Sequence, residues 1–548
     1  VKKRIAEVIG HELWHMWSGN LVTMKWWNDL WLNESFANYM AFKALHYYFP
    51  EWNIWEYHLE SETLGALDAD SLKTTHPISV EVKSPNEIEE LFDEISYGKG
   101  GSVLRMIDSF LGEETFKKGV GFYLDKFKYS NAEADDFWNC LSRFSKENIK
   151  KIAKSWINQP GYPLLKVESR GKKLVIEQEA FQDAFKGQRW LIPLTIRPNG
   201  ETKTVVLKKR RQKIRLDSEY FKLNHDQTGF FRVKYSKRDL KNLKNLVKNN
   251  KISSIDLFGI CNDLFYLALY GKISVDHYIE FIKLCKDEKD YLVLAEIHRS
   301  LYKIDRIFSN LSNWNLLFKK LNSQIEEVFI NAFSNLGWNP RKQEMINETL
   351  LRPVVISNLS LLRNEKIIEE GKRKFNSFHK DVRSSGYGLI ASNGNELEYE
   401  KILNKYRKEK DVEEKKDLLV SLYRFEDLEL LKKSLNLIFS GEVRLQDYPY
   451  IFYYIRFNKR FRELFLNFVR ENWNKFNEHK DSFFIFSRFL DALIITNLDK
   501  LGEVHNFLKD KEILYQKTKE EAFENAKVQK RFLDKNAVII EKYLSRAN

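Results

Sequence analysis

The spacing of hydrophobic positions changes twice along this chain of 548 residues. Residues 1–162 carry apolar side chains at helical intervals, as in RIAEVIGHELWHMW and GSVLRMIDSFLG. From 163 to 236 apolar and polar residues alternate, with Gly-Lys and Asn-Gly pairs at the expected turns. Helical spacing returns from 237 to 548, in paired amphipathic segments such as KKDLLVSLYRF. The pattern predicts a multidomain α+β protein.

Three domains are expected from this division. Residues 1–162 are predicted to form a mostly helical domain, which ends at SWINQPGYP because proline cannot continue a helix. Residues 163–236 are expected to form a small antiparallel β-sandwich. Residues 237–548 are expected to form an α-helical, HEAT/armadillo-like superhelix, since the helix pairs recur without a strict period.

Composition narrows the class of protein. The net charge of +13 comes from 90 basic and 77 acidic residues, and runs such as KDVEEKKD interleave the two signs. This is typical of solvated helix faces, so no nucleic-acid partner is expected. No window is apolar for long enough to cross a bilayer, so no membrane association is expected either. Cys140, Cys261 and Cys285 are far apart and odd in number, which favours buried thiols in a reduced, cytoplasmic protein.

One stretch near the start, HELWHMWSGNLVTMKWWNDLWLNESF, carries the candidate chemistry. On a helix, His11 and His15 lie one turn apart and can reach one metal ion, while Glu12 is displaced enough to reach a metal-bound water. Glu34, separated from His15 by eighteen residues, is the natural third ligand from the next helix. Two imidazoles and one carboxylate leave the fourth tetrahedral position open, which is typical of a catalytic zinc, one per chain.

The sequence indicates less strongly which other polar residues would support the metal ligands. A ligating imidazole usually donates its second N–H to an acceptor, and Asn33 or Asp29 is placed to offer one. Either residue could equally cap the helix that carries Glu34. The remaining nine histidines, such as His46 and His76, lack metal-ligand spacing and are expected on the surface or as satisfied core residues.

The same stretch, extended to NYM, resembles the gluzincin zinc aminopeptidases of the aminopeptidase N family. The resemblance continues in THPISVEVKSPNEIEELFDEISYGKGGSVLRMI, WINQPGYP and GFFRVKY, and reaches the family's C-terminal helical domain in LGWNPRKQEMINETLLRPVV. The archaeal tricorn-interacting aminopeptidase factors are the most similar in character. The resemblance covers most of the chain and implies that residues 1–162 are the C-terminal part of a thermolysin-like domain.

The resemblance also implies residue roles. His11, His15 and Glu34 are implied to bind zinc, and Glu12 is implied to be the general base. Tyr97, in ISYGKG, is implied to stabilise the tetrahedral intermediate, although periodicity does not distinguish it among 25 tyrosines. The implied activity is zinc-dependent removal of N-terminal residues from peptides, and association with a larger protease is a further implication.

The sequence departs from the family in the residues that would bind the N-terminus of the substrate. In the family, an upstream glutamate and a GxMEN motif hold the α-ammonium group, but none of the five methionines here precedes Glu-Asn. We expect this anchoring region to come from outside the chain, as the preceding part of a longer protein or as a second polypeptide. Ser18 replaces the family's usual phenylalanine, and we expect a neutral core change.

Two alternative functions stay open. The first is a non-catalytic helical scaffold with a vestigial zinc site, which the presence of His11, Glu12, His15, Glu34 and Tyr97 disfavours. The second is a relative of the zinc epoxide hydrolases, which the expected β-sandwich disfavours because that branch lacks one. Zinc content and hydrolysis of an aminoacyl substrate distinguish the three functions.

Overall fold

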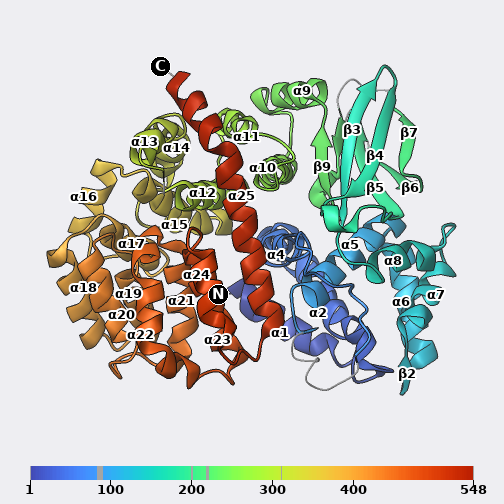
Figure 1. The fold of residues 1–548 in the computed structure, drawn as a ribbon. Coiled ribbons are helices and arrows are strands. Elements are labelled where there is room, and N and C mark those ends of the chain that lie inside the picture. The colour runs from blue at the N-terminus through green and yellow to red at the C-terminus, as the bar shows by residue number, and fades with distance from the viewer. Residues whose placement is uncertain (1, 83–90, 199–201, 217–220, 310, 547–548) are drawn as a thin grey trace. The chain divides into compact units, whose positions relative to one another are not determined.

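The computed structural model describes residues 2–82, 91–198, 202–216, 221–309 and 311–546 (Figure 1). The chain divides into two compact units, Val1–Asp263 and Leu264–Asn548. It is mostly helical with small sheets, as the pattern predicted. Among the described residues, no helix is both long and apolar enough to cross a membrane. All three cysteines are buried.

The first unit begins with a helical part that carries the candidate metal ligands. Its α-helices are α1 (Lys2–Trp14), α2 (Glu34–Tyr48), α3 (Ile54–His58), α4 (Leu64–Ala69), α5 (Gly100–Leu111), α6 (Glu113–Phe127), α7 (Ala134–Ser142) and α8 (Ile149–Ile157). Its shorter turns are the 3-10 helices η1 (Trp27–Leu32) and η2 (Pro50–Trp52) and the π-helices η3 (Leu59–Thr63) and η6 (Ile95–Lys99). Strands β1 (Val22–Met24) and β2 (Ser130–Ala132) pair in parallel.

Aromatic side chains fill the core of this helical part. The rings of Trp31 and Trp138 stack with centroids 5.4 Å apart, and Phe36 packs on Phe137 at 5.0 Å. All four side chains are fully buried. Burying rings of this size contributes several kcal/mol, which fixes η1 and the start of α2 against α7.

Seven strands of the first unit form two sheets, in the region where alternation predicted them. The strands are β3 (Pro163–Arg170), β4 (Lys173–Ala180), β5 (Ile192–Pro198), β6 (Lys203–Leu207), β7 (Arg211–Arg215), β8 (Phe221–Leu223) and β9 (Arg232–Tyr235). Their order is β7-β4-β3-β9 in one sheet and β6-β5-β8 in the other. Gly171, at φ +57°, supplies the left-handed turn between β3 and β4. The expected Asn-Gly turn at 199–200 lies outside the described residues.

One strand pair corrects the sequence-based prediction of an antiparallel sandwich. Strand β9 pairs with β3 in parallel, with Leu164 opposite Arg232, so the four-stranded sheet is mixed. After β4 the chain builds β5 and β6 of the second sheet and returns to the first sheet for β7. It then adds β8 to the second sheet and comes back as β9, in the direction of β3. Two short 3-10 turns, η7 (Asp183–Phe185) and η8 (His225–Gln227), lie along this path. The division into domains at 162 and 236 stays a prediction.

Helix α9 (Lys237–Lys248) follows β9, and α10 (Ser254–Leu269) spans the boundary between the units. The second unit consists of α11 (Val275–Ile282), α12 (Tyr291–Phe308), α13 (Trp314–Ser323), α14 (Glu326–Leu336), α15 (Ile346–Leu361), α16 (Glu365–Arg373), α17 (Arg383–Ser392), α18 (Glu396–Lys408), α19 (Val412–Leu422), α20 (Leu428–Leu437), α21 (Tyr448–Phe457), α22 (Phe465–Asn477), α23 (Phe483–Thr496), α24 (Leu501–Lys509) and α25 (Gln516–Arg546). The 3-10 turns η9 (Lys283–Cys285), η10 (Leu445–Asp447) and η11 (Lys459–Glu463) connect some of them.

Alternate helices of the second unit pack on one another. Helix α15 packs on α17 and α17 on α19, and the same holds for α21, α23 and α25. Helix α25 runs back along the unit as a single long helix (Figure 1) and packs on α11, α12 and α13. Asn536 in α25 accepts a hydrogen bond from the backbone N–H of Val275 at 3.1 Å, which ties the last helix to the first.

Candidate metal centre

A glycine lets the helix that carries the candidate ligands approach α2 closely. A Cβ at Gly10 would lie 3.2 Å from the Cβ of Ala41, so a larger residue would push α1 away from α2. His11 follows Gly10 directly and therefore lies at this close contact. The α-helix ends at Trp14, but the N–H of His15 still donates to the carbonyl of His11 at 3.1 Å. The two histidines therefore stay one turn apart, as the spacing predicted.

The structure brings the three predicted ligands together. The Nε2 atoms of His11 and His15 lie 2.9 Å apart, and Oε2 of Glu34 lies 3.4 Å from the first and 3.7 Å from the second. Glu34 reaches them from the first position of α2. Between 14% and 21% of each side chain is exposed, so the cluster is accessible from solvent.

The spacing of these donor atoms fits a tetrahedral metal ion. Donor atoms at the usual zinc distances of about 2.0–2.1 Å lie about 3.3 Å from one another in a tetrahedron. The three separations in the cluster bracket this value. Two imidazole nitrogens and one carboxylate oxygen are also a donor set that zinc prefers. The residues present therefore fit a zinc ion.

Hydrogen bonds keep Glu34 ionised. Burial by itself would raise the pKa of Glu34, but the bonds from His11, His15 and Tyr97 outweigh it and lower the pKa to about 2. The bond to Glu34 likewise raises the pKa of His15. The cluster thus concentrates negative charge between the imidazoles, where a cation would bind.

Tyr97 lies beside this cluster and is carried by a π-helix, a structure frequent at functional sites. Its ring centroid is 6.2 Å from that of His11, and its hydroxyl bonds to Glu34. Burial and the charges of Glu34 and Glu12 raise the pKa of Tyr97, so its hydroxyl keeps its proton at neutral pH. It is therefore a hydrogen-bond donor.

Two glycines let the π-helix fit between its neighbours. A Cβ at Gly98 would lie 2.7 Å from the backbone oxygen of Glu62 in η3. A Cβ at Gly100 would lie 2.8 Å from the Cβ of Ser35, the residue after Glu34. The hydroxyl of Ser35 donates to the carbonyl of Ser96. The glycines of ISYGKGG thus place Tyr97 against the start of α2.

His76 and Asp93 support the π-helix, and sequence reasoning assigned neither of them to the site. Oδ1 of Asp93 accepts hydrogen bonds from the backbone N–H groups of Ile95 and Ser96, both at 3.0 Å. Oδ2 of Asp93 lies 2.6 Å from Nε2 of His76. An aspartate just before a helix is a common capping signal, and the sequence FDEISYGKG contains it.

Glu12 lies on α1 directly after His11, and its side chain is exposed. Its charge is close enough to raise the pKa values of both His15 and Tyr97. Glu12 therefore faces the same space as the other candidate residues, without being one of the three clustered donors.

The outer acceptor for a ligand histidine differs from the sequence-based expectation. Nδ1 of His15 lies 3.0 Å from the carbonyl oxygen of Ser18, which is a backbone acceptor that no side-chain pattern indicates. Asp29 instead accepts hydrogen bonds from the backbone N–H of Ala134 and from Trp31. Asn33 precedes α2 without a side-chain capping bond, and its Oδ1 is buried without a partner in the described chain.

The outer face of α1 is apolar and exposed. Ile5, Ile9, Leu13 and Met16 are each 54–57% exposed, although they recur at helical spacing like a core stripe. On the inner face Glu7 is buried and accepts a hydrogen bond from the hydroxyl of Tyr57 at 2.7 Å. An exposed apolar stripe of this kind is typical of a surface that binds another protein segment, a membrane or a ligand.

A second group with metal-binding residue types is an ion-pair network. Nδ1 of His225 lies 2.7 Å from Asp256, and its Nε2 lies 3.3 Å from Asp226. Arg197 contacts the same Nε2 at 3.1 Å, and Lys222 lies 3.6 Å from Asp256. Because Lys222 already pairs with Asp256 and Arg197 places a positive charge against the imidazole, this group does not fit a metal ion.

Comparisons with known proteins match the chain to two family models. The Peptidase family M1 domain matches residues 1–156, and the ERAP1-like C-terminal domain matches residues 220–528. The chain is 39% identical to probable aminopeptidase 2 of Sulfurisphaera tokodaii over 83% of its length. It is 35% identical to leucyl aminopeptidase of Saccharolobus solfataricus over 93% of its length. It is 34% identical to tricorn protease-interacting factor F2 of Thermoplasma acidophilum over 85% of its length. These alignments cover 57%, 63% and 58% of the respective relatives, so the chain spans about three fifths of their length.

Proposed function

Since the chain belongs to the M1 family of peptidases, we propose that it is the zinc-binding and helical part of an aminopeptidase that removes N-terminal residues from peptides. The observation that carries the proposal is the convergence of His11, His15 and Glu34 within the spacing of a tetrahedral zinc site. Glu12 and Tyr97 face the same space, so the site also holds an exposed carboxylate and a hydroxyl donor.

In this proposal, His11, His15 and Glu34 hold one zinc ion per chain. When bound, zinc polarises the scissile carbonyl and lowers the pKa of a bound water to about 7. The carboxylate of Glu12 accepts the proton of the attacking water and delivers it to the leaving amine. The hydroxyl of Tyr97, which stays protonated, donates a hydrogen bond to the oxygen that becomes negative in the transition state. Its bond to Glu34 holds the hydroxyl in place before substrate binds.

The finer architecture belongs to the same proposal. Residues 1–162 would be the C-terminal part of a thermolysin-like domain, residues 163–236 a β-sandwich and residues 237–548 a HEAT/armadillo-like superhelix. The mostly helical fold, with two small sheets in residues 163–236, supports this division. The buried cysteines support a reducing, cytoplasmic location.

We also propose that residues outside this chain hold the α-ammonium group of the substrate. The exposed stripe of Ile5, Ile9, Leu13 and Met16 on α1 supports a covering segment beside the candidate zinc site. The greater length of the relatives supports the same idea. One relative is named for its interaction with the tricorn protease, which supports association with a larger protease.

The test is hydrolysis of an aminoacyl fluorogenic substrate by this chain alone and with the N-terminal region of a longer relative joined before it. The proposal expects zinc in both proteins and activity in the joined protein, with Glu12→Gln losing at least 1,000-fold in kcat while keeping its zinc. Glu51→Gln, a surface glutamate after α2, is the matched control and should keep full activity. Zinc binding without hydrolysis by either protein would contradict the peptidase function.

A further inference from the structure

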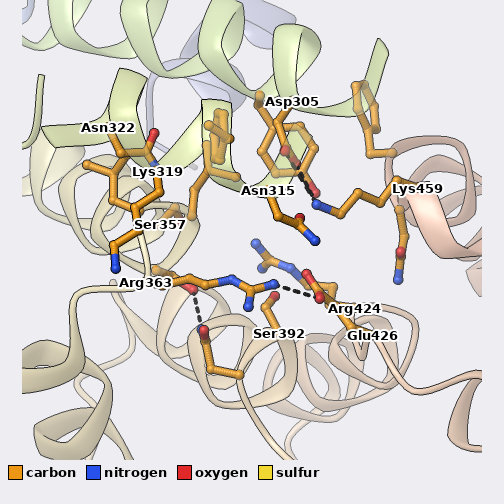
Figure 2. Close-up of a pocket in the computed structure, with 18 of the residues that line it drawn as sticks. Asp305, Asn315, Lys319, Asn322, Ser357, Arg363, Ser392, Arg424, Glu426 and Lys459 are labelled. Atoms are coloured by element: carbon orange, nitrogen blue, oxygen red, sulfur yellow. Dashed lines mark hydrogen bonds and ion pairs between the residues drawn. The ribbon is translucent and has the colours of Figure 1, made fainter. Parts of the chain in front are cut away.

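A polar cavity lies within the second unit, apart from the residues of the candidate metal centre. Its volume is about 420 Å³, within the usual range for small-molecule sites. Helices α12 and α13 line one side of it, and the turns that follow α15, α17, α19 and α21 line the other. Figure 2 shows charged side chains reaching into this space from both sides.

The cations that line the cavity exceed the carboxylates that could neutralise them. Arg363 pairs with Glu426 at 2.8 Å, and Lys459 pairs with Asp305 at 3.2 Å. The third lining carboxylate, Glu365, begins helix α16, where the positive end of the helix dipole stabilises it. Lys319 and Arg424 form no ion pair within the part of the chain that the structure describes.

Among the described residues, Arg424 is held in place by contacts other than an ion pair. Its guanidinium lies 3.5 Å from the carbonyl of Ser384 and 5.5 Å from the ring centroid of Tyr454. Gly388 makes this approach possible, because a Cβ there would collide with the guanidinium. The nearby His298 is neutral, since burial and the charge of Arg424 lower its pKa to about 3. The amide of Asn358 accordingly donates to its Nδ1 at 3.1 Å.

Arg363 occupies a backbone position that favours glycine. Its φ is +56°, and the N–H of Asn364 donates to the carbonyl of Leu359 at 3.0 Å, so α15 ends in a Schellman motif with Arg363 at its left-handed residue. An arginine there weakens the turn relative to glycine. Its side chain is 63% exposed and pairs with Glu426, and Figure 2 shows its guanidinium near that of Arg424.

A buried acceptor on the opposite side also lacks a partner. Asn322 lines the cavity and is only 7% exposed, and its Oδ1 accepts no hydrogen bond in the described chain. A buried amide oxygen left unsatisfied is unfavourable, but this atom is closed to solvent and therefore also to a ligand in the open cavity.

We propose that this cavity binds a small oxyanion, a phosphate or a carboxylate, through Arg424 and Arg363. Both guanidinium groups present the paired N–H donors that oxyanions bind in bidentate fashion. Lys319 adds positive charge to the lining of the cavity. The site is independent of the proposed peptidase chemistry, because none of its residues belongs to the metal centre.

Calorimetric titration of the zinc-loaded chain with orthophosphate and, separately, with succinate tests the proposal. We expect at least one of the two to bind at 1:1, and the one that binds more tightly identifies the ligand as a phosphate or a carboxylate. Arg424→Gln should weaken that binding at least tenfold. Arg407→Gln, which removes an exposed ion pair with Glu442 elsewhere in the unit, should leave it unchanged.

The variant Arg363→Gly distinguishes a loss of oxyanion binding from a loss of stability. Because the left-handed position favours glycine, this variant should unfold at a higher temperature than the wild type and still bind the oxyanion several-fold more weakly. The proposal is overturned if neither anion binds the wild-type chain at 1:1, or if Arg363→Gly and Arg424→Gln both bind as tightly as the wild type.

Discussion

Nζ of Lys99 lies 2.9 Å from Oδ2 of Asp70, and both side chains are completely buried. The remaining donors of Lys99 reach the backbone carbonyls of Gln159 and Gly161, and Asp70 accepts the N–H of Gly161 at 2.9 Å. Because Lys99 follows Tyr97 by two residues, this pair anchors the π-helix that carries the candidate catalytic hydroxyl.

Removing one partner of this pair should destabilise the first unit strongly. Lys99→Met leaves the carboxylate of Asp70 buried without a counter-charge, and the expected loss in the free energy of unfolding is about 3–5 kcal/mol. Adding Asp70→Asn to that variant should recover part of the loss. Chemical denaturation measures both. Lys128→Met, which breaks an exposed pair with Asp125, should leave the free energy of unfolding nearly unchanged.

Substituting alanine for two glycines in the helical part of the first unit should change the stability of the protein in opposite directions. Gly100→Ala places a Cβ against Ser35 and should cost about 1–3 kcal/mol of stability. Gly121 lies inside α6, and a Cβ there would meet no atom within 4 Å. Gly121→Ala should therefore stabilise the protein by up to about 1 kcal/mol through helix propensity. Equal effects of the two substitutions in thermal unfolding would contradict the close packing of the π-helix on α2.

Asp93 should act on catalysis through Tyr97. In the joined protein with the N-terminal region, Tyr97→Phe should lower kcat by about 100- to 1,000-fold with zinc retained, as for loss of one oxyanion donor. Asp93→Asn weakens the cap of the π-helix and its bond to His76, so it should lower kcat more than it raises KM. If Asp93 acts by positioning the hydroxyl, Asp93→Asn should cost little further activity in the Tyr97→Phe background. Fully multiplicative losses would show that the two residues act independently.

Glu414 should make the stability of the second unit depend on acid pH. Burial would raise its pKa, but hydrogen bonds from Lys405, Tyr387 and Arg383 lower it from 4.5 to about 2. A carboxyl with a depressed folded-state pKa stabilises the protein fully above the unfolded value, and this contribution is lost as the pH falls from about 4.5 toward 2. Between pH 7 and pH 4 the wild type should lose about 1 kcal/mol more unfolding free energy than Glu414→Gln. Glu429→Gln, an exposed control, should follow the wild type.

The convergence of His11, His15 and Glu34 could be predicted from the sequence because its signal is local. The spacing of His11 and His15 follows from one helical turn, and the prediction that a helix begins near Glu34 is confirmed by α2. The first helix ends at Trp14, and Gly19, at φ +130°, belongs to the turn that follows it. The ligand roles themselves stay predictions until a metal is measured.

Contacts between distant segments could not be predicted from the sequence. Alternation in β9 indicates a strand but carries no information on its direction, which depends on the path of the chain between β3 and β9. The support of Tyr97 by His76 depends on a bond across seventeen residues, to Asp93. The cavity of the second unit likewise depends on two helices and four turns that meet only in the fold.

Zinc stoichiometry by mass spectrometry under native conditions tests the central claim most directly. The wild-type chain should carry one zinc ion, which His11→Ala and Glu34→Ala should each lose at micromolar free zinc. His225→Ala, in the ion-pair network that does not fit a metal, should retain it. A wild-type chain that binds no zinc, or variants at His11 and Glu34 that keep it, would contradict the assignment of this cluster as the metal centre.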